Sequence, residues 1–204
     1  MLFTIKELYT RPGNSIREYL EGKRVKHFKP LAFLFVVSTF YALFAHFFNN
    51  QTSLEDFLTG INIGSKKVNK DNIFYNSIKW FAIHYAYTNV LLIPIMSLAS
   101  FIAFKKARFN YFQHIILNSF IGGQRIFALL LLTPIAYFIE NQNIKDFYSI
   151  LILLLGISLT IWTYFQFFNN LKSFSKLIRS VVSYILFGVF IVLILFGLLG
   201  LSKI

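Results

Sequence analysis

Five long apolar stretches, none containing an acidic residue, constrain this chain more than any other feature of its sequence. A helix needs about 20 predominantly apolar residues to cross the hydrocarbon core of a bilayer. The stretches have about that length and cover residues 31–48, 80–104, 115–139, 147–168 and 181–201. We therefore expect an all-α, polytopic transmembrane helical bundle with five spans.

The composition agrees with a membrane protein. Hydrophobic residues make up 56% of the chain and charged residues 14%, whereas a soluble domain has about 25% charged residues. The absence of cysteine excludes disulfides, thiolate zinc sites and cysteine nucleophiles. Because the first apolar stretch begins too far along the chain for a signal peptide, we expect it to act as its own insertion signal.

The distribution of Lys and Arg predicts the orientation, since cytoplasmic loops carry an excess of both. Most of them precede the first stretch or lie between the second and third and between the fourth and fifth. We therefore expect a cytoplasmic amino terminus and a periplasmic carboxyl terminus. Residues 1–29 then form a cytoplasmic basic juxtamembrane segment, and residues 30–204 form the transmembrane domain.

The third stretch leaves a four-span alternative open, because it contains Arg125. An arginine at the membrane centre costs about 2.5 to 3.5 kcal/mol on insertion scales. With the inner boundary near Phe120, Arg125 is about 7.5 Å deep, and we expect its side chain to reach back to the headgroups. If the segment turns back instead, the chain has four spans, and the charge bias does not distinguish the two arrangements.

Residues 10–30, which read TRPGNSIREYLEGKRVKHFKP, form the most motif-like part of the chain. Pro12-Gly13 predicts a turn, and Ser15 with Glu18 predicts a capping box that starts a short juxtamembrane helix. Gly22 predicts the left-handed end of that helix. A strongly basic run follows and leads to Pro30, which opens the first span.

This basic segment has two interpretations. It is either a topology anchor, which any first span needs, or a site for anionic lipid or a phosphorylated ligand. The second interpretation rests on guanidinium groups that can bind phosphate bidentately and on basic residues of the same membrane face. The predicted ligand-binding residues are Arg11, Arg17, Lys23, Arg24, Lys29, His114 and Arg125.

At these residues the chain resembles an uncharacterised family of bacterial integral membrane proteins, domain of unknown function 3667. The resemblance rests on Arg11-Pro12-Gly13, on Tyr19 with Gly22-Lys23-Arg24, and on Pro30; Asn110-Tyr111 with His114 is a weaker match. The family usually has Glu before that histidine, where this chain has Gln113, which weakens any acid or base role there. The 204 residues contain no cysteine and so hold none of the zinc ribbon that many relatives carry. The resemblance implies a transmembrane fold and a bacterial inner-membrane location, and it implies no activity.

Several kinds of chemistry are disfavoured by the sequence. All eight acids fall outside the apolar stretches, so we predict no intramembrane carboxylate relay. The four histidines lack metal-binding spacing, and neither a serine nucleophile elbow nor a phosphate-binding loop is present. Gly122-Gly123 is interpreted as relieving crowding beside Arg125. We therefore expect no metal and no cofactor. We also expect no nucleic-acid partner, because membrane insertion accounts for the net charge of +12.

The sequence thus favours a non-enzymatic inner-membrane protein whose basic cytoplasmic face contacts anionic membrane lipid or a phosphorylated ligand. The alternative is a lipid-modifying enzyme or a small permease that uses His114 and Arg125. Protein partners and the oligomeric state stay open.

Overall fold

The computed structural model describes residues 1–47 and 73–201, which contain helices and no strand. Five helices are long and apolar enough to cross a membrane. They are α3 (Pro30–Phe47), α6 (Tyr85–Ala103), α7 (Tyr111–Tyr137), α8 (Gln142–Phe167) and α9 (Ser173–Leu201). The predicted all-α bundle with five spans is confirmed by these lengths and compositions.

Shorter helices precede or connect the long ones. They are α1 (Leu2–Thr10), α2 (Pro12–Leu20), α5 (Ile73–Ile83) and the 3₁₀ helix η1 (Lys105–Ala107). Helices α1 and α2 fall within the predicted juxtamembrane segment, where the sequence indicated only one helix. Thr52 or Ser53 followed by acids also predicts a short surface helix near residues 54–58, and that segment lies outside the described residues.

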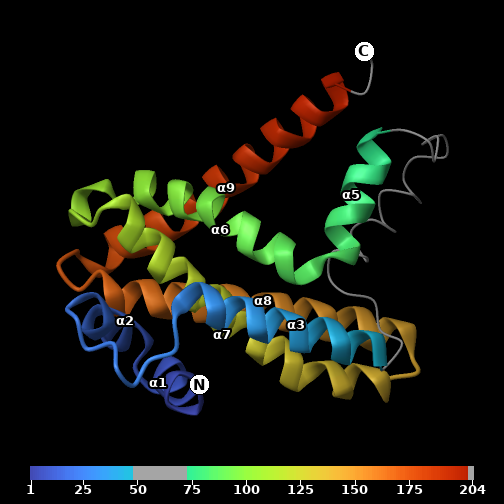
Figure 1. The fold of residues 1–204 in the computed structure, drawn as a ribbon, viewed down its shortest axis with the longest axis horizontal. Helices are drawn as coiled ribbons and strands as arrows, with labels where there is room; N and C mark the ends of the chain where they lie inside the picture. The colour runs from blue at the N-terminus through green and yellow to red at the C-terminus, as the bar shows by residue number, and fades with distance from the viewer. Residues whose placement is uncertain (48–72, 202–204) are drawn as a thin grey trace.

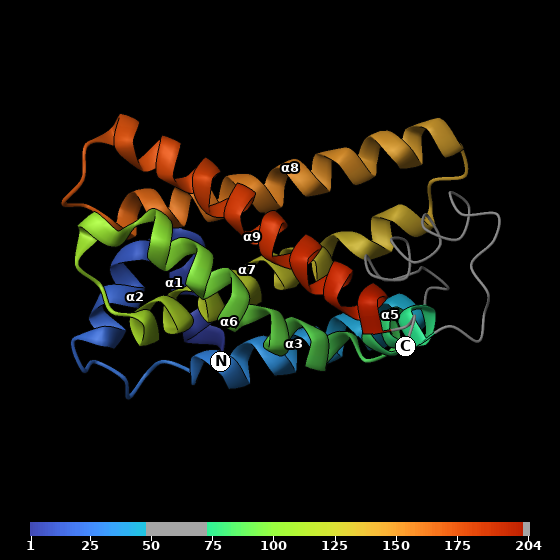
Figure 2. The same ribbon diagram turned by 90° about the horizontal axis from the view of Figure 1, so that it is seen from above.

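The long helices pack in two groups (Figure 1). Helices α3, α7 and α8 lie alongside one another, and α6 and α9 pack together across them. The view from above shows α9 crossing over α7 (Figure 2). Helices α1 and α2, η1 and the α8–α9 connection all gather at one end of the bundle, next to the start of α3. We call this the basic end.

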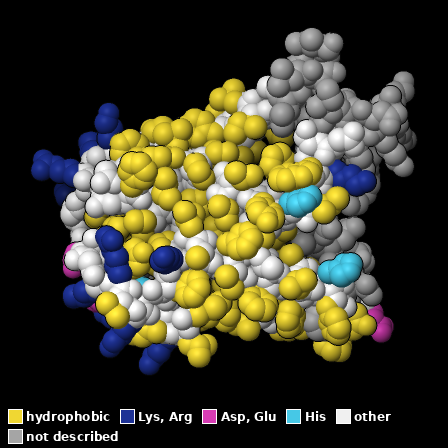
Figure 3. Space-filling model, viewed as in Figure 1, with side chains coloured by type: hydrophobic (Ala, Val, Ile, Leu, Met, Phe, Trp, Pro, Cys, Tyr) yellow, Lys and Arg dark blue, Asp and Glu magenta, His cyan; other side chains and the backbone are white. Residues whose placement is uncertain are grey.

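The charged residues follow this arrangement. Figure 3 shows Lys and Arg side chains concentrated at the basic end, with a broad hydrophobic surface along the middle of the bundle. Exposed apolar residues are frequent along α8 and α9, among them Leu153, Val189 and Leu193. An apolar exterior of this kind is expected where lipid, and not water, is the solvent.

Polar capping extends two spanning helices beyond their apolar stretches. Helix α7 begins at Tyr111 because Asn110 and Gln113 form a capping box: the Gln113 backbone N–H donates to Asn110 Oδ1 at 2.9 Å, and the Asn110 N–H donates to Gln113 Oε1 at 2.8 Å. Asn141 likewise caps α8, accepting from the backbone N–H groups of Asn143 and Ile144. A capping box accepts Gln as well as Glu at this position, so Gln113 keeps the structural role despite its departure from the family pattern.

The predicted second span is interrupted at its start. Residues 80–83 belong to α5, which ends before His84, and α6 takes a different direction from α5 (Figure 1). At the junction the Thr88 hydroxyl donates to the Phe81 carbonyl at 2.7 Å, and the Trp80 and His84 rings stack with centroids 4.3 Å apart. The span that the structure supports therefore starts at Tyr85.

Close helix contacts explain the paired glycines of α7. A Cβ on Gly123 would lie 2.4 Å from the Phe33 ring of α3, and one on Gly122 would lie 3.1 Å from Leu34. These glycines therefore let α3 and α7 approach each other. The interpretation that they relieve crowding beside Arg125 is wrong, because the glycine that contacts Arg125 is Gly156 of α8.

Candidate functional site

Arg11 joins α1 to α2 through two ion pairs. Its Nε lies 2.6 Å from Glu7 Oε2, and its Nη1 donates to Glu18 Oε1 at 2.7 Å. The hydrogen bond from Arg11 lowers the pKa of Glu18 below its ordinary value. Arg11 is therefore engaged within the protein and holds the two helices as a hairpin. Its binding to a phosphate stays a prediction without support from this geometry.

The predicted start of α2 is wrong. The helix begins at Pro12, three residues before Ser15, and it has no side-chain cap. Proline suits the first helical position because its missing N–H has no intrahelical acceptor there. Pro12-Gly13 thus opens the helix and does not form a turn, while Ser15 is buried inside it and Glu18 pairs with Arg11.

Gly13 and Arg17 attach α2 to the end of α8. A Cβ on Gly13 would lie 2.3 Å from the backbone nitrogen of Phe167, so only glycine allows this approach. The Gly13 N–H donates to Gln166 Oε1 at 3.2 Å. The Arg17 side chain donates to the Phe167 carbonyl at 3.2 Å and to Asn14 Oδ1 at 2.5 Å. Arg17 therefore caps the last turn of α8, where a cation is favourable.

Helix α2 ends as predicted at Gly22, whose φ is +103°. The Gly22 N–H donates to the Tyr19 carbonyl at 3.2 Å, and the Lys23 N–H donates to the Glu18 carbonyl at 3.0 Å. These two bonds form a Schellman motif, which turns the chain back toward α1. The Phe28 N–H then donates to the Thr4 hydroxyl at 2.8 Å, so the basic run between α2 and α3 is tied to α1.

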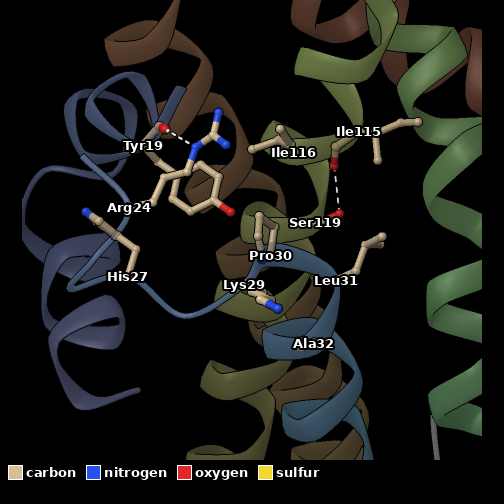
Figure 4. Close-up of a pocket in the computed structure, with 10 residues that line it drawn as sticks. All are labelled: Tyr19, Arg24, His27, Lys29, Pro30, Leu31, Ala32, Ile115, Ile116 and Ser119. Carbon is tan, nitrogen blue, oxygen red and sulfur yellow. Dashed lines mark hydrogen bonds between the residues drawn. The ribbon is translucent and has the colours of Figure 1, made fainter. Parts of the chain in front are cut away.

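A pocket of about 590 Å³ opens between this basic run, α3 and α7 (Figure 4). We call it the α2–α3 pocket. Its lining combines the basic run's Arg24, His27 and Lys29 with a largely apolar remainder, which is Tyr19, Pro30, Leu31, Ala32, Ile115, Ile116 and Ser119. Cationic and apolar groups thus meet at the point where the first spanning helix starts.

Arg24 is partly oriented within the α2–α3 pocket. Its Nε donates to the Tyr19 carbonyl at 3.3 Å, and its guanidinium carbon lies 5.5 Å from the centre of the Tyr19 ring. Figure 4 shows the guanidinium beside Ile116, with the Nη atoms turned away from the Tyr19 carbonyl. No hydrogen bond or ion pair to the rest of the described chain occupies these Nη atoms. Arg24 can therefore donate two further hydrogen bonds to an anion.

His27 lies at the edge of the α2–α3 pocket. Its ring packs edge-on against Phe3, Tyr19 and Phe120, with centroids 5.2 to 6.4 Å apart. Burial lowers the pKa of His27 below its ordinary value of 6.5, with Glu7 and Glu18 opposing the shift and Arg11 adding to it. At neutral pH the positive charge of the pocket therefore comes from Arg24 and Lys29.

The other predicted binding residues lie apart from the α2–α3 pocket. Lys23 is exposed beside it in the basic run. His114 is 1% exposed inside the bundle, where its Nδ1 lies 2.9 Å from Ser100 Oγ. Asn118 donates to Ser100 Oγ at 2.8 Å and accepts a hydrogen bond from the Tyr164 hydroxyl, also at 2.8 Å. His114 is therefore part of a buried network that joins α6, α7 and α8, as is common for polar residues within spanning helices.

Arg125 lies neither in the α2–α3 pocket nor at the basic end. Its guanidinium packs beside Gly156, where an added Cβ would lie 3.2 Å from Arg125 Nε. At 1.5 Å per residue, Gly156 is about 16 Å along α8 from Phe167, the residue that Arg17 contacts at the basic end. The Arg125 side chain therefore extends away from the basic end, because Gly156 leaves room for the guanidinium there. The expectation that it reaches back toward the headgroups is wrong.

Sequence reasoning placed Arg24 and Lys29 in the candidate site and missed Tyr19, His27 and Ser119. His27 lies in the same basic run, but a side chain that is largely neutral at pH 7 gives no charge signal in the sequence. Ile115 and Ser119 carry no signal of their own, since only the packing of α7 against the start of α3 brings them to the pocket.

Residues 1–42 match the model of a family described as "Protein of unknown function (DUF3667)". They comprise α1, α2, the basic run and most of α3, which are the elements that form the hairpin and much of the α2–α3 pocket. No curated protein and no solved structure matches the chain. The match confirms the resemblance seen at Arg11-Pro12-Gly13 and Gly22-Lys23-Arg24: residues 1–42 of this multi-pass membrane protein are similar to the DUF3667 family.

Proposed function

We propose that this membrane protein binds an anionic phospholipid in the α2–α3 pocket, with the lipid phosphate between Arg24 and Lys29. The observation that carries the proposal is that basic and apolar side chains line one pocket at the start of α3. A free phosphate would use only the basic residues. A phospholipid uses both kinds, because its glycerol and acyl chains can lie along Leu31 and Ile115 while the phosphate meets the basic residues.

The same proposal assigns the basic end to the cytoplasmic side of a bacterial inner membrane. Lys and Arg are retained on that side during insertion, and the described ones concentrate there (Figure 3). The far end of the bundle, including the carboxyl end of α9, then faces the periplasm. Anionic lipids of the cytoplasmic leaflet would meet the α2–α3 pocket directly.

Paired charge substitutions test the lipid site. The Arg24→Gln/Lys29→Gln variant removes both cations that line the pocket, whereas Lys23→Gln/Lys26→Gln removes equal charge from the same run outside it. At about 1 kcal/mol per cation near anionic lipid, the first variant should bind phosphatidylglycerol roughly 25-fold more weakly, and the control should change affinity by much less. Native mass spectrometry of protein extracted from mixed phosphatidylglycerol–phosphatidylcholine bilayers measures the bound lipid.

Two results would contradict the proposal. Equal losses in both variants would mean that net charge, and not the pocket, attracts the lipid. Glycerol phosphate has the headgroup phosphate but no acyl chains. If it displaced phosphatidylglycerol as strongly as the lipid itself does, the apolar residues of the pocket would contribute nothing to lipid affinity.

A further inference from the structure

Arg125 is a charged group in a spanning helix without a counter-charge. It makes no hydrogen bond or ion pair with any residue that the structure describes. The described acids all lie outside the five spanning helices or in their terminal turns, and the sequence places all eight acids outside the apolar stretches. A guanidinium in a spanning segment normally pairs with an anion or reaches water, because burying an isolated charge is costly.

The local packing keeps a place open for this side chain. Gly156 is buried on the face of α8 that meets α7, and a Cβ there would lie 3.5 Å from Arg125 Nη2 as well as 3.2 Å from Nε. Arg125 itself is partly exposed. The guanidinium therefore lies along the bare backbone of α8, with part of its surface open to an additional group.

Hydroxyl and amide groups near Arg125 bring no negative charge. The fully buried Tyr164 hydroxyl, which donates to Asn118 Oδ1, is close enough to both Arg125 and Tyr184 for electrostatic interaction. The Tyr184 hydroxyl is buried and has no hydrogen-bond partner among the described residues. This region thus provides one positive charge and neutral polar groups, but no carboxylate.

We infer that the partly exposed guanidinium of Arg125, which lies against Gly156 of α8, binds a carboxylate. The planar guanidinium matches a carboxylate through two parallel hydrogen bonds, and its single charge balances a single negative charge. A phosphate dianion would leave excess negative charge away from water. A second copy of this chain does not supply the group from a span, because none of its apolar stretches contains an acid.

The apolar surroundings of the site also suit the tail of a fatty acid. Leu153 and Leu154 precede Gly156 on α8 and expose 61% and 51% of their surface. A carboxylate with a long alkyl chain would place the chain over such residues, while a short carboxylate would use Arg125 alone. This site is separate from the α2–α3 pocket and does not depend on the lipid proposed there.

Binding of radiolabelled oleate to the full chain in phosphatidylcholine nanodiscs tests the inference. We expect saturable binding that Arg125→Gln weakens at least tenfold. Gly156→Leu keeps the charge but puts a side chain where the Arg125 guanidinium lies against α8, so it should weaken binding similarly. The matched control is Lys106→Gln, which removes one exposed positive charge outside both the α2–α3 pocket and the Arg125 site and should bind oleate like the unmodified protein.

Competition identifies the part of the ligand that is recognised. Oleyl alcohol, which has the same chain without the charge, should not displace oleate. Displacement by acetate would support a site for carboxylates in general, and its failure would support a fatty-acid site. The inference is overturned if oleyl alcohol competes as well as oleate, if oleate does not bind saturably, or if Gly156→Leu binds normally while correctly folded by thermal unfolding.

Discussion

At the scale of single residues, cations that look alike in the sequence have different roles. Arg11 pairs with two acids, Arg17 caps α8, and Arg24 lines the α2–α3 pocket. Arg125 lies along a glycine within the bundle. Arg24 and Arg125 each keep donors that no described residue occupies, whereas Arg11 and Arg17 do not stand free, so net charge alone is a poor guide to the binding residues.

His27 predicts a pH dependence of lipid binding. Its pKa is lowered in the folded protein, so as the pH falls below about 6.5 the unfolded chain takes up the proton first and the unliganded fold loses stability. A bound phosphate would raise the pKa of His27 by attraction. Lipid affinity should therefore rise about twofold to fivefold from pH 8 to pH 5.5, as one partial positive charge is added.

Titration of phosphatidylglycerol binding in nanodiscs measures this effect, because the charge of a phosphodiester does not change in that pH range. His27→Gln should bind similarly at pH 8 and lose the pH dependence. An unchanged pH profile in this variant would exclude His27 as the responsible group.

At the scale of elements, the α1–α2 hairpin is held by contacts with both neighbouring long helices. Arg17 and Gly13 attach α2 to α8, while buried Gln124 of α7 donates to the Leu8 carbonyl of α1 at 2.6 Å and accepts from Thr163 of α8 at 3.1 Å. The Tyr9 hydroxyl donates to the Gln124 carbonyl at 2.5 Å. The hairpin is thus a packed part of the bundle, which keeps the basic run in position over α3.

Gly13→Ala should detach α2 from α8. The new Cβ would lie 2.3 Å from Phe167 N and 2.4 Å from Gln166 Cβ, so backbone must move, and overpacking of this kind costs about 1 to 3 kcal/mol. Hydrogen exchange of residues 1–20 should accelerate. Gly188→Ala is the matched control, since no atom of the described residues that could crowd its added Cβ lies within 4 Å, and alanine favours a helix interior. Equal exchange in the two variants would show that the Gly13 contact does not hold the hairpin.

At the scale of the whole molecule, alternating helix directions place the hairpin, η1 and the α8–α9 connection at one end (Figure 1). The described basic residues concentrate there, so helix packing and the bias in Lys and Arg agree on which segments share a side. Helix α7 contacts α3, α6 and α8 and occupies the centre of the bundle. Whether α7 crosses the bilayer therefore decides between the five-span and the four-span arrangement.

Single cysteines test this topology without background, because the natural chain has none. Cysteine in place of Lys26, Lys106 or Lys172 should react with an impermeant maleimide only after the cytoplasmic side is opened. Cysteine in place of Lys145, in α8 after the α7–α8 connection, should react in spheroplasts with the inner membrane intact. Protection of the Lys145 position together with Lys106 would remove the α7 crossing and leave four spans.

The sequence by itself determined the number and approximate position of the spanning helices, the grouping of basic segments and the end of α2 at Gly22. These properties are local, since apolar length, loop charge and a left-handed glycine act through the chain's own neighbourhood or through the bilayer. Helix starts were less accurate where capping residues such as Asn110 extend a helix beyond its apolar part.

Only the tertiary structure decided which polar groups meet. Arg17 contacts Phe167, Tyr19 shares a pocket with Ile115, and Arg125 lies beside Gly156, although each pair is far apart in the chain. Such contacts depend on which helix faces pack together, and hydrophobic periodicity in a lipid-facing helix does not specify a neighbour. The contacts of each arginine therefore follow from how the helices pack and not from the sequence around it.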